Sequence, residues 1–129
     1  MVQVNDIVKA RYNSGEYIGR VLEERGNFLL VEVLAVLEHP QQGDLHHLGE
    51  VDGVAFHERK ALAYREKFNA RKRTTKLYEG DVPTYAESLK TALNTLKKQL
   101  TERNDEFGEL SLSRISDLEK DFYNKIFEE

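Results

Sequence analysis

The sequence predicts a β plus α fold in which a small SH3-like β-barrel is followed by an α-helical hairpin. Up to about Tyr64, short apolar runs with many β-branched residues alternate with turns that contain Gly and Asn, as is typical of strands. From Pro83 onward, the apolar residues recur at the period of an amphipathic helix. The chain of 129 residues is long enough for one small globular domain with a helical appendage.

Five strands are expected in the first half of the chain, at residues 7–12, 17–22, 28–37, 54–57 and 61–64. The third run, FLLVEVLAVL, is the most apolar, and its Val content and the preceding Gly26-Asn27 turn favour a curved strand over a helix. The last run could instead form a single helical turn. Five short strands with tight turns favour a strongly bent barrel, because closure removes the exposed edges of a small sheet.

The second half of the chain begins with a basic segment and a helix. Residues 65–80 are rich in Lys and Arg, so we expect an extended surface connector there. A first helix is expected from residue 83 to about residue 103. Its buried face comprises Tyr85, Leu89, Ala92, Leu93, Leu96 and Leu100. Pro83 fits a first helical turn, and Thr84 with Glu87 alternatively fits a capping box.

A second helix is expected at residues 114–127, after a loop marked by Gly108 and a cap supplied by Ser111 or Ser113. Its apolar face comprises Ile115, Leu118, Phe122 and Ile126. Two amphipathic helices joined by about ten residues pack most simply as an antiparallel hairpin. The expected domains are a barrel at 1–64, a basic connector at 65–80 and a helical hairpin at 81–129.

The composition excludes several classes of protein. The chain has no cysteine, which excludes disulfides, thiolate zinc sites, iron–sulfur clusters and a cysteine nucleophile. The net charge is −4, so bulk attraction to nucleic acid or anionic lipid is not expected. The N-terminal segment carries charges throughout, and no run approaches the ~20 apolar residues of a membrane span. We therefore expect a soluble, cytoplasmic protein with no direct membrane insertion.

The charges are distributed unevenly, and the basic ones form a band. Residues 58–76 hold eight basic and two acidic residues, whereas the segments on either side are acidic. The band is densest at Arg71, Lys72, Arg73 and Lys76. These side chains could contact an acidic protein partner or phosphates, or the band could dock on the acidic parts of its own molecule or remain a solvated linker. Nucleic-acid binding would also need aromatic side chains for base stacking, for which Phe68 and Tyr78 are the candidates.

Two aromatic or apolar features also have two interpretations each. Tyr12, Tyr17 and Phe28 could line a peptide-binding groove on the barrel, although residues of this kind more often form the core. The leucine stripe of the first helix could bind a partner, but intramolecular packing is the simpler interpretation. Neither feature predicts a binding site on its own.

Four histidines raise the question of a metal site. His39, His46, His47 and His57 lie close together in the sequence with Asp44, and imidazole and carboxylate are ordinary zinc ligands. Their spacing matches no rigid metal motif, so solvated or hydrogen-bonded loop histidines are the simpler interpretation. The chain has no G-x-S-x-G elbow and no glycine-rich phosphate-binding motif. The sequence therefore predicts no catalytic, cofactor-binding or metal-binding residues.

Four long segments carry a resemblance to a known family. They are DIVKARYNSGEYIGRVLEE, FLLVEVLAVLEHPQQGDLHH, FHERKALAYREK and KLYEGDVPTYAESLKTAL. In this order and spacing they resemble the bacillar kinase-associated protein B family over nearly the whole chain. The resemblance implies a small accessory protein of spore-forming bacteria, needed for signalling by a membrane sensor histidine kinase that feeds the sporulation phosphorelay. It also implies an SH3-like barrel followed by helices, and it assigns no catalytic residues.

The sequence departs from the family in one respect. Members are described as lipoproteins that are anchored through a cysteine after a signal sequence, and we find neither feature here. We therefore expect membrane proximity to come only through a partner.

Three hypotheses about function follow. The first is an accessory protein that docks on the cytoplasmic part of a sporulation sensor histidine kinase. Its docking surface would combine Arg71, Lys72, Arg73 and Lys76 with an exposed face of the barrel. The alternative is a nucleic-acid-binding SH3-like barrel, whose affinity would fall steeply with salt. The third is an enzyme or metal protein that uses the histidine cluster.

Overall fold

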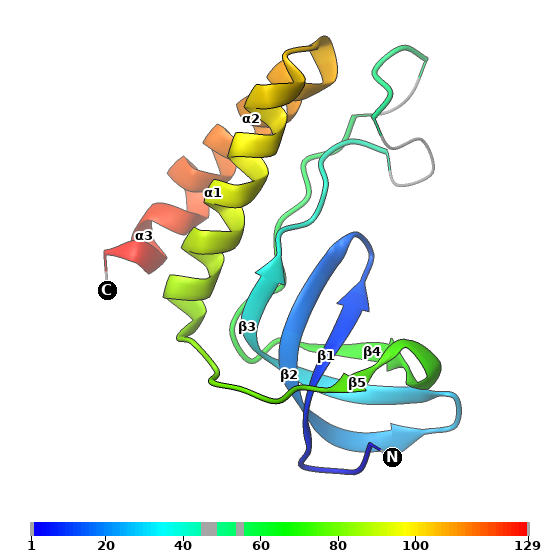
Figure 1. The fold of residues 1–129 in the computed structure, drawn as a ribbon. Coiled ribbons are helices and arrows are strands. Elements are labelled where there is room, and N and C mark those ends of the chain that lie inside the picture. The colour runs from blue at the N-terminus through cyan, green and yellow to red at the C-terminus, as the bar shows by residue number, and fades with distance from the viewer. Residues whose placement is uncertain (1, 45–48, 54–55, 129) are drawn as a thin grey trace.

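The structure consists of a five-stranded antiparallel sheet with a helical hairpin beside it. This computed structural model describes residues 2–44, 49–53 and 56–128. The strands are β1 (Ile7–Tyr12), β2 (Gly15–Arg25), β3 (Phe28–Glu38), β4 (Lys67–Arg71) and β5 (Lys76–Leu77), and they pair in the order β4-β3-β2-β1-β5. The sheet is strongly bent, and the helices stand next to β3 (Figure 1). The predicted β plus α fold class is confirmed, as are the first three expected strands.

The two longest strands bend because their pairing is irregular. β2 and β3 pair along their length, but the register shifts after Glu16, after Ile18 and after Val21. Irregularities of this kind increase the local twist and bend the strand. Gly19 lies at one of them, and a Cβ atom at this position would come within 2.6 Å of the Glu32 carbonyl oxygen. Glycine is therefore required at this position, where the backbone of β3 passes close to β2.

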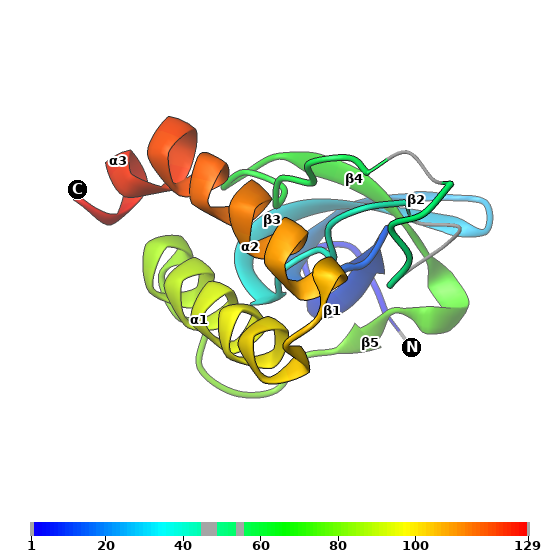
Figure 2. The ribbon, with the colours of Figure 1, turned by 90° about the horizontal axis from the view of Figure 1, so that it is seen from above.

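The helices form the expected antiparallel hairpin, which Figure 2 shows from above. α1 (Tyr85–Arg103) is followed by α2 (Glu106–Leu118), which continues into a π-helical turn, η2 (Glu119–Tyr123), and a last turn, α3 (Asn124–Phe127). The predicted buried face of α1 is confirmed, and it packs on β3. The Ser88 hydroxyl of α1 also accepts a hydrogen bond from the backbone N–H of Val36 at 2.9 Å. Within the described ranges, no helix has the length and apolar character needed to cross a lipid bilayer.

The first helix is capped by Thr84. Its hydroxyl oxygen accepts a hydrogen bond from the Glu87 backbone N–H at 3.2 Å, so Thr84 precedes the helix and Pro83 lies outside it. Replacing Thr84 by Ala should lower the free energy of unfolding by about 1 kcal/mol, because one N–H of the first turn loses its acceptor. Urea denaturation measures this effect, with Thr91→Ala at an exposed position inside α1 as the control. Equal stability of Thr84→Ala and the unmodified chain would contradict the assignment.

Residues 65–80 are not the extended connector that their charge suggested. They supply β4, the one-turn 3₁₀ helix η1 (Lys72–Thr74) and β5. In β4, Phe68 and Ala70 are buried while the residues between and beside them are exposed. This alternation is the pattern of a half-buried strand, in which Lys and Arg occupy the solvent side. The division of the chain into three domains itself stays a prediction.

Neither of the strands expected at 54–57 and 61–64 occurs in the described part of the chain. Residues 54–55 lie outside the described residues. The rest of this region runs as an extended segment next to the chain that leaves β3 (Figure 1). The buried side chain of Gln42 accepts a hydrogen bond from the Arg59 N–H and donates one to its carbonyl oxygen, both at 2.8 Å. The Gln42 side chain thus makes the two hydrogen bonds with the Arg59 backbone that a neighbouring strand would otherwise have made.

Three tyrosine hydroxyl groups form hydrogen bonds with the backbone of the next part of the same segment. The Ala61 N–H donates to the Tyr123 hydroxyl at 3.0 Å, and the Leu62 N–H donates to the Tyr17 hydroxyl at 3.1 Å. The Tyr85 hydroxyl in turn donates to the Leu62 carbonyl oxygen at 2.6 Å. Because these backbone groups already have partners, the segment needs no neighbouring strand. It connects β2, α1 and η2 instead.

The second helix begins eight residues earlier than expected. The Asp105 carboxylate accepts a hydrogen bond from the Gly108 N–H at 2.8 Å, so Asp105 is the cap and neither Ser111 nor Ser113 has this role. Gly108 is a helical residue, not a loop residue. A Cβ atom at Gly108 would lie 2.6 Å from the Leu100 carbonyl oxygen of α1, so glycine allows the two helices to come close.

The π-helical turn changes which side chains of this helix are buried. Ile115 and Leu118 are buried as predicted, and Ile126 is half-buried. Phe122, expected on the buried face, is 41% exposed, whereas Tyr123 is fully buried. A π-helical turn contains one more residue than an α-helical turn, which shifts the buried position by one residue. The prediction of Phe122 as a core residue was therefore wrong.

Candidate partner-binding surface

The four basic residues singled out in the sequence gather at one end of the sheet. Arg71 ends β4, Lys72 and Arg73 lie in η1, and Lys76 begins β5. All four are exposed. We call this surface the basic edge, and it comprises Arg71, Lys72, Arg73 and Lys76. The single turn of 3₁₀ helix between two strands is what keeps these residues together.

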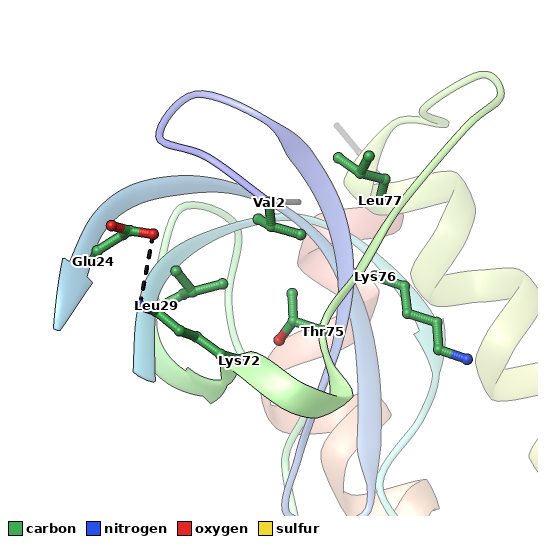
Figure 3. Close-up of a pocket in the computed structure, with 7 residues that line it drawn as sticks. All are labelled: Val2, Glu24, Leu29, Lys72, Thr75, Lys76 and Leu77. Carbon is green, nitrogen blue, oxygen red and sulfur yellow. Dashed lines mark ion pairs between the residues drawn. The ribbon is translucent and has the colours of Figure 1, made fainter. Parts of the chain in front are cut away.

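The basic edge borders a first hollow, with a volume of about 490 Å³ (Figure 3). It is lined by Val2, Glu24, Leu29, Lys72, Thr75, Lys76 and Leu77. Lys72 extends toward Glu24, and its Nζ lies 3.6 Å from Oε1 of that carboxylate. Lys76 points away from this ion pair, and Thr75 lies between the two lysines (Figure 3). The hollow therefore has mainly apolar walls, formed by Val2, Leu29 and Leu77, and the Lys72–Glu24 ion pair at one end.

A second hollow, of about 410 Å³, adjoins the first through Lys72. It is lined by Asn27, Phe28, Arg71, Lys72 and Arg73. The guanidinium carbon of Arg71 lies 5.8 Å from the centroid of the Phe28 ring, within the range of a cation–π contact. Phe28 remains 39% exposed. Here too a basic surface lies next to an exposed apolar group.

The cations of the basic edge differ in their availability. Lys72 is engaged with Glu24, and Arg71 lies over an aromatic ring. The side chains of Arg73 and Lys76 have no hydrogen bond or ion pair among residues 2–44, 49–53 and 56–128. Exposed cations without an internal partner can bind an external anionic group at no cost to the fold. The arrangement fits a partner with negative charge.

Sequence reasoning missed the apolar part of this surface. Val2, Leu29 and Leu77 come from three distant parts of the chain, and only the pairing of β1 with β5 and the fold of the N-terminus bring them together. No local pattern in the sequence links them. The exposure of Leu77, at 48%, also follows from its place on a two-residue edge strand.

The aromatic residues considered for base stacking or peptide binding are differently placed. Phe68 is buried, with its ring centroid 5.5 Å from that of Tyr12 and 5.8 Å from that of Tyr17. It cannot stack a base, so its prediction as a stacking residue was wrong. Tyr78 is half-buried, and its hydroxyl donates to the Asp81 carbonyl oxygen at 2.9 Å. Tyr17 belongs to the core, so a groove lined by Tyr12, Tyr17 and Phe28 together does not form.

Two of the four histidines can be placed. His46 and His47 lie outside the described residues, and His57 is exposed. The part of the chain that the structure describes contains no group of three side chains suited to bind a metal ion. His39 is buried and has hydrogen-bond partners on both ring nitrogens.

The burial and the hydrogen bonds of His39 together indicate a neutral ring. A carbonyl oxygen can only accept, so Nδ1 donates to the Pro40 carbonyl oxygen at 2.9 Å. In the neutral ring Nε2 is then the acceptor for the Tyr123 hydroxyl at 2.8 Å. Burial lowers the pKa of His39 to about 4, and the hydrogen bond to Pro40 acts in the opposite direction. The neutral ring thus connects the chain after β3 to η2 and, through Tyr123, to Ala61.

The tyrosine hydroxyls that hold this region also have shifted pKa values. Burial raises the pKa of Tyr17 to about 12, although its hydrogen bond from Leu62 lowers it. Burial likewise raises the pKa values of Tyr85 and Tyr123 above their usual range. All three therefore remain protonated near neutral pH and keep their hydrogen bonds.

Comparison with known proteins identifies the family. The family profile described as "Kinase associated protein B" matches residues 12–123. A protein of Bacillus subtilis (strain 168) named kinase-associated lipoprotein B is 44% identical over 123 residues, which cover 95% of this chain and 96% of that protein. The crystal structure of kinase-associated protein B from Bacillus cereus superposes with a TM-score of 0.80 at 38% identity, covering 95% of this chain and 98% of the other. The chain therefore belongs to the kinase-associated protein B family, which supports a kinase-associated accessory role.

Proposed function

We propose that this protein binds a sensor histidine kinase that feeds the sporulation phosphorelay and modulates its activity without catalysing a reaction. Membership of a family named for its association with a kinase supports a kinase as the partner. In the structure, the feature that supports direct docking on the kinase is the basic edge. It offers two cations, Arg73 and Lys76, whose side chains have no partner within the described residues, beside exposed apolar groups such as Phe28 and Leu77.

Modulation by binding requires a difference in affinity between two states of the kinase. A protein that bound both conformations equally would shift nothing, however tightly it bound. A coupling of about 1–3 kcal/mol, or roughly 5- to 150-fold, is typical of such regulation. The proposal therefore includes a preference of the basic edge for one kinase conformation.

The proposed place of action is the cytoplasmic side of the membrane, at the cytoplasmic part of the kinase. The protein would be recruited to the membrane by its partner. This arrangement needs no membrane-spanning segment of its own.

The test is direct binding between the full chain and the purified cytoplasmic part of a sporulation sensor histidine kinase. Reversing both free cations, with Arg73→Glu and Lys76→Glu together, should weaken binding about tenfold or more, because each reversal replaces an attraction by a repulsion. Adding Arg71→Glu and Lys72→Glu should weaken it further. Isothermal titration calorimetry or surface plasmon resonance at two salt concentrations measures both effects.

The matched control reverses two exposed lysines on the helical hairpin, Lys98→Glu and Lys120→Glu, neither of which has an ion pair among the described residues. This control should bind as the unmodified chain does. Unchanged affinity of the Arg73 and Lys76 variant would remove the basic edge from the interface. Failure of the unmodified chain to bind or alter the kinase would refute the proposed function.

A further inference from the structure

We propose that the second hollow binds an acidic segment of the partner protein. The guanidinium groups of Arg71 and Arg73 bind a carboxylate of this segment, and an apolar side chain next to that carboxylate covers the exposed ring of Phe28. This inference rests on the proposed function and specifies which part of the basic edge makes the contact. It also assigns the contact to guanidinium groups in particular, beyond positive charge alone.

The strand register places Phe28 between two arginines. Arg25 of β2 and Arg71 of β4 are both directly opposite Phe28 of β3. Directly opposite residues project from the same face of a sheet. The next residues of β3 and β4, Leu29 and Ala70, are buried on the other face, so Phe28 and Arg71 project toward solvent. An exposed aromatic ring therefore stands next to a guanidinium group, whose carbon is 5.8 Å from the ring centroid.

The charges around the second hollow do not cancel. Its lining contains Arg71, Lys72 and Arg73 and no acidic residue. Lys72 forms an ion pair with Glu24, which lines the first hollow and not the second. The side chains of Arg71 and Arg73 have no ion pair or hydrogen bond within the described ranges. Two guanidinium groups are therefore available to an external anion.

A carboxylate next to an apolar side chain matches this surface. A guanidinium group presents its N–H donors in a planar fork that binds both oxygens of a carboxylate, whereas a Lys ammonium is a point charge. Asn27, also in the lining, can donate from its side-chain amide. The hollow, of about 410 Å³, has room for an aspartate or glutamate side chain. Phe28 is 39% exposed, so an apolar side chain that covers its ring removes apolar surface from water.

The neighbouring residues on this face favour a protein segment over a nucleic acid. Single-stranded nucleic acids stack successive bases on several aromatic side chains along a positively charged groove. Here the next residue of β3 on the same face is Leu30, and the residues opposite it are Glu23 and Asn69. Glu23 forms an ion pair with Arg25 at 3.1 Å. The face thus offers one aromatic ring and a carboxylate that would repel a phosphate backbone.

The first experiment tests this chemistry without the kinase. The ¹⁵N-labelled full chain is titrated at low salt with a short peptide in which one phenylalanine is flanked by glutamates. We expect the backbone amides of Asn27, Phe28 and Arg73 to shift and to saturate at millimolar peptide. A peptide with alanine in place of phenylalanine should bind about fivefold more weakly, and one with lysines in place of the glutamates should not bind. Absence of shifts at these amides, equal binding of the alanine peptide, or larger shifts with a single-stranded oligonucleotide would overturn the inference.

The second experiment separates guanidinium chemistry from charge, with the cytoplasmic part of the kinase as the partner. Arg71→Lys and Arg73→Lys together keep both charges but remove both planar forks, so binding should weaken about fivefold. The matched control is Lys72→Arg with Lys76→Arg, which also conserves charge within the basic edge and should bind as the unmodified chain does. Normal binding of the first variant would overturn the assignment to guanidinium groups.

The same assay tests the apolar contact. Phe28→Ala should weaken binding about fivefold, because the ring that the partner covers is lost. The matched control is Val82→Ala, since Val82 is 42% exposed, close to the 39% of Phe28, and lies outside the second hollow. The ¹⁵N spectrum of each variant confirms that it is folded. Normal binding of Phe28→Ala would overturn the apolar contact.

The two proposals fail differently. If the unmodified chain binds the kinase and the arginine and Phe28 variants bind equally well, the second hollow is not the docking site, while the proposed function stands. If the acidic peptide binds as described and the unmodified chain does not bind the kinase, the proposed partner is wrong and the chemistry of the hollow is right.

Discussion

Replacing Tyr123 by Phe should lower the free energy of unfolding by about 3 kcal/mol, although only one oxygen atom is removed. The Tyr123 hydroxyl donates to Nε2 of His39 and accepts from the N–H of Ala61, at 2.8 and 3.0 Å. Tyr123 is fully buried, so water cannot replace the lost partner. Two buried polar groups would be left without a hydrogen bond, each at a cost of about 1–3 kcal/mol.

Urea denaturation at neutral pH measures this loss. The control is Tyr78→Phe, since the Tyr78 hydroxyl donates to a carbonyl oxygen in an exposed turn and its removal should change stability little. A double variant with Tyr123→Phe and His39→Leu should lose less than the two single variants together, because His39 then no longer leaves an unsatisfied acceptor. A loss in Tyr123→Phe no larger than in Tyr78→Phe would show that the hydroxyl does not hold this region.

The elements that the sequence predicted correctly are those whose stability is local. β1, β2 and β3 carry β-branched residues between clear turns, and α1 carries its apolar stripe and its Thr84 cap within one continuous segment. In β4 the alternation of buried Phe68 and Ala70 with polar residues was present in the sequence. The density of Lys and Arg obscured this alternation, because a run of charges is also typical of a solvated linker.

The elements that the sequence did not predict depend on distant partners. The run at 61–64 has the composition of a strand, but hydroxyl groups from three other elements bind its backbone. Gly108 is a common loop signal, yet here it lies in a helix because the backbone of α1 passes next to it. The burial of Tyr123 instead of Phe122 follows from a π-helical turn, for which the sequence has no simple signal.

For the same reason, the sequence predicted only one part of the candidate site. Its basic residues are close in sequence, so their charge density could be seen directly. Val2 and Leu77 come together beside them only through the register of β1 with β5 and the path of the N-terminus. A band of charge is therefore visible in the sequence, whereas the apolar hollow next to it is a product of the fold.

The stability of the protein should fall by about 3 kcal/mol as the pH is lowered from 7 to 4, because of His39 alone. Burial lowers its pKa to about 4 in the folded chain, whereas in the unfolded chain it is near 6.5. Above about pH 6.5 the ring is neutral in both states, and the full stability is present. Between the two pKa values the unfolded chain binds a proton that the folded chain excludes, so lower pH favours unfolding.

The window from pH 7 to pH 5 isolates this effect from the carboxylates. The pKa of Asp105, for example, is lowered by its hydrogen bond from Arg103, so its contribution is lost only below about pH 4. Urea denaturation across the window should show a slope that His39→Gln removes and His57→Gln, at an exposed position, retains. Equal slopes in all three proteins would mean that His39 takes up a proton as readily in the folded chain as in the unfolded one. In that case Nε2 could not be the acceptor for the Tyr123 hydroxyl, and the connection between the chain after β3 and η2 would need another explanation.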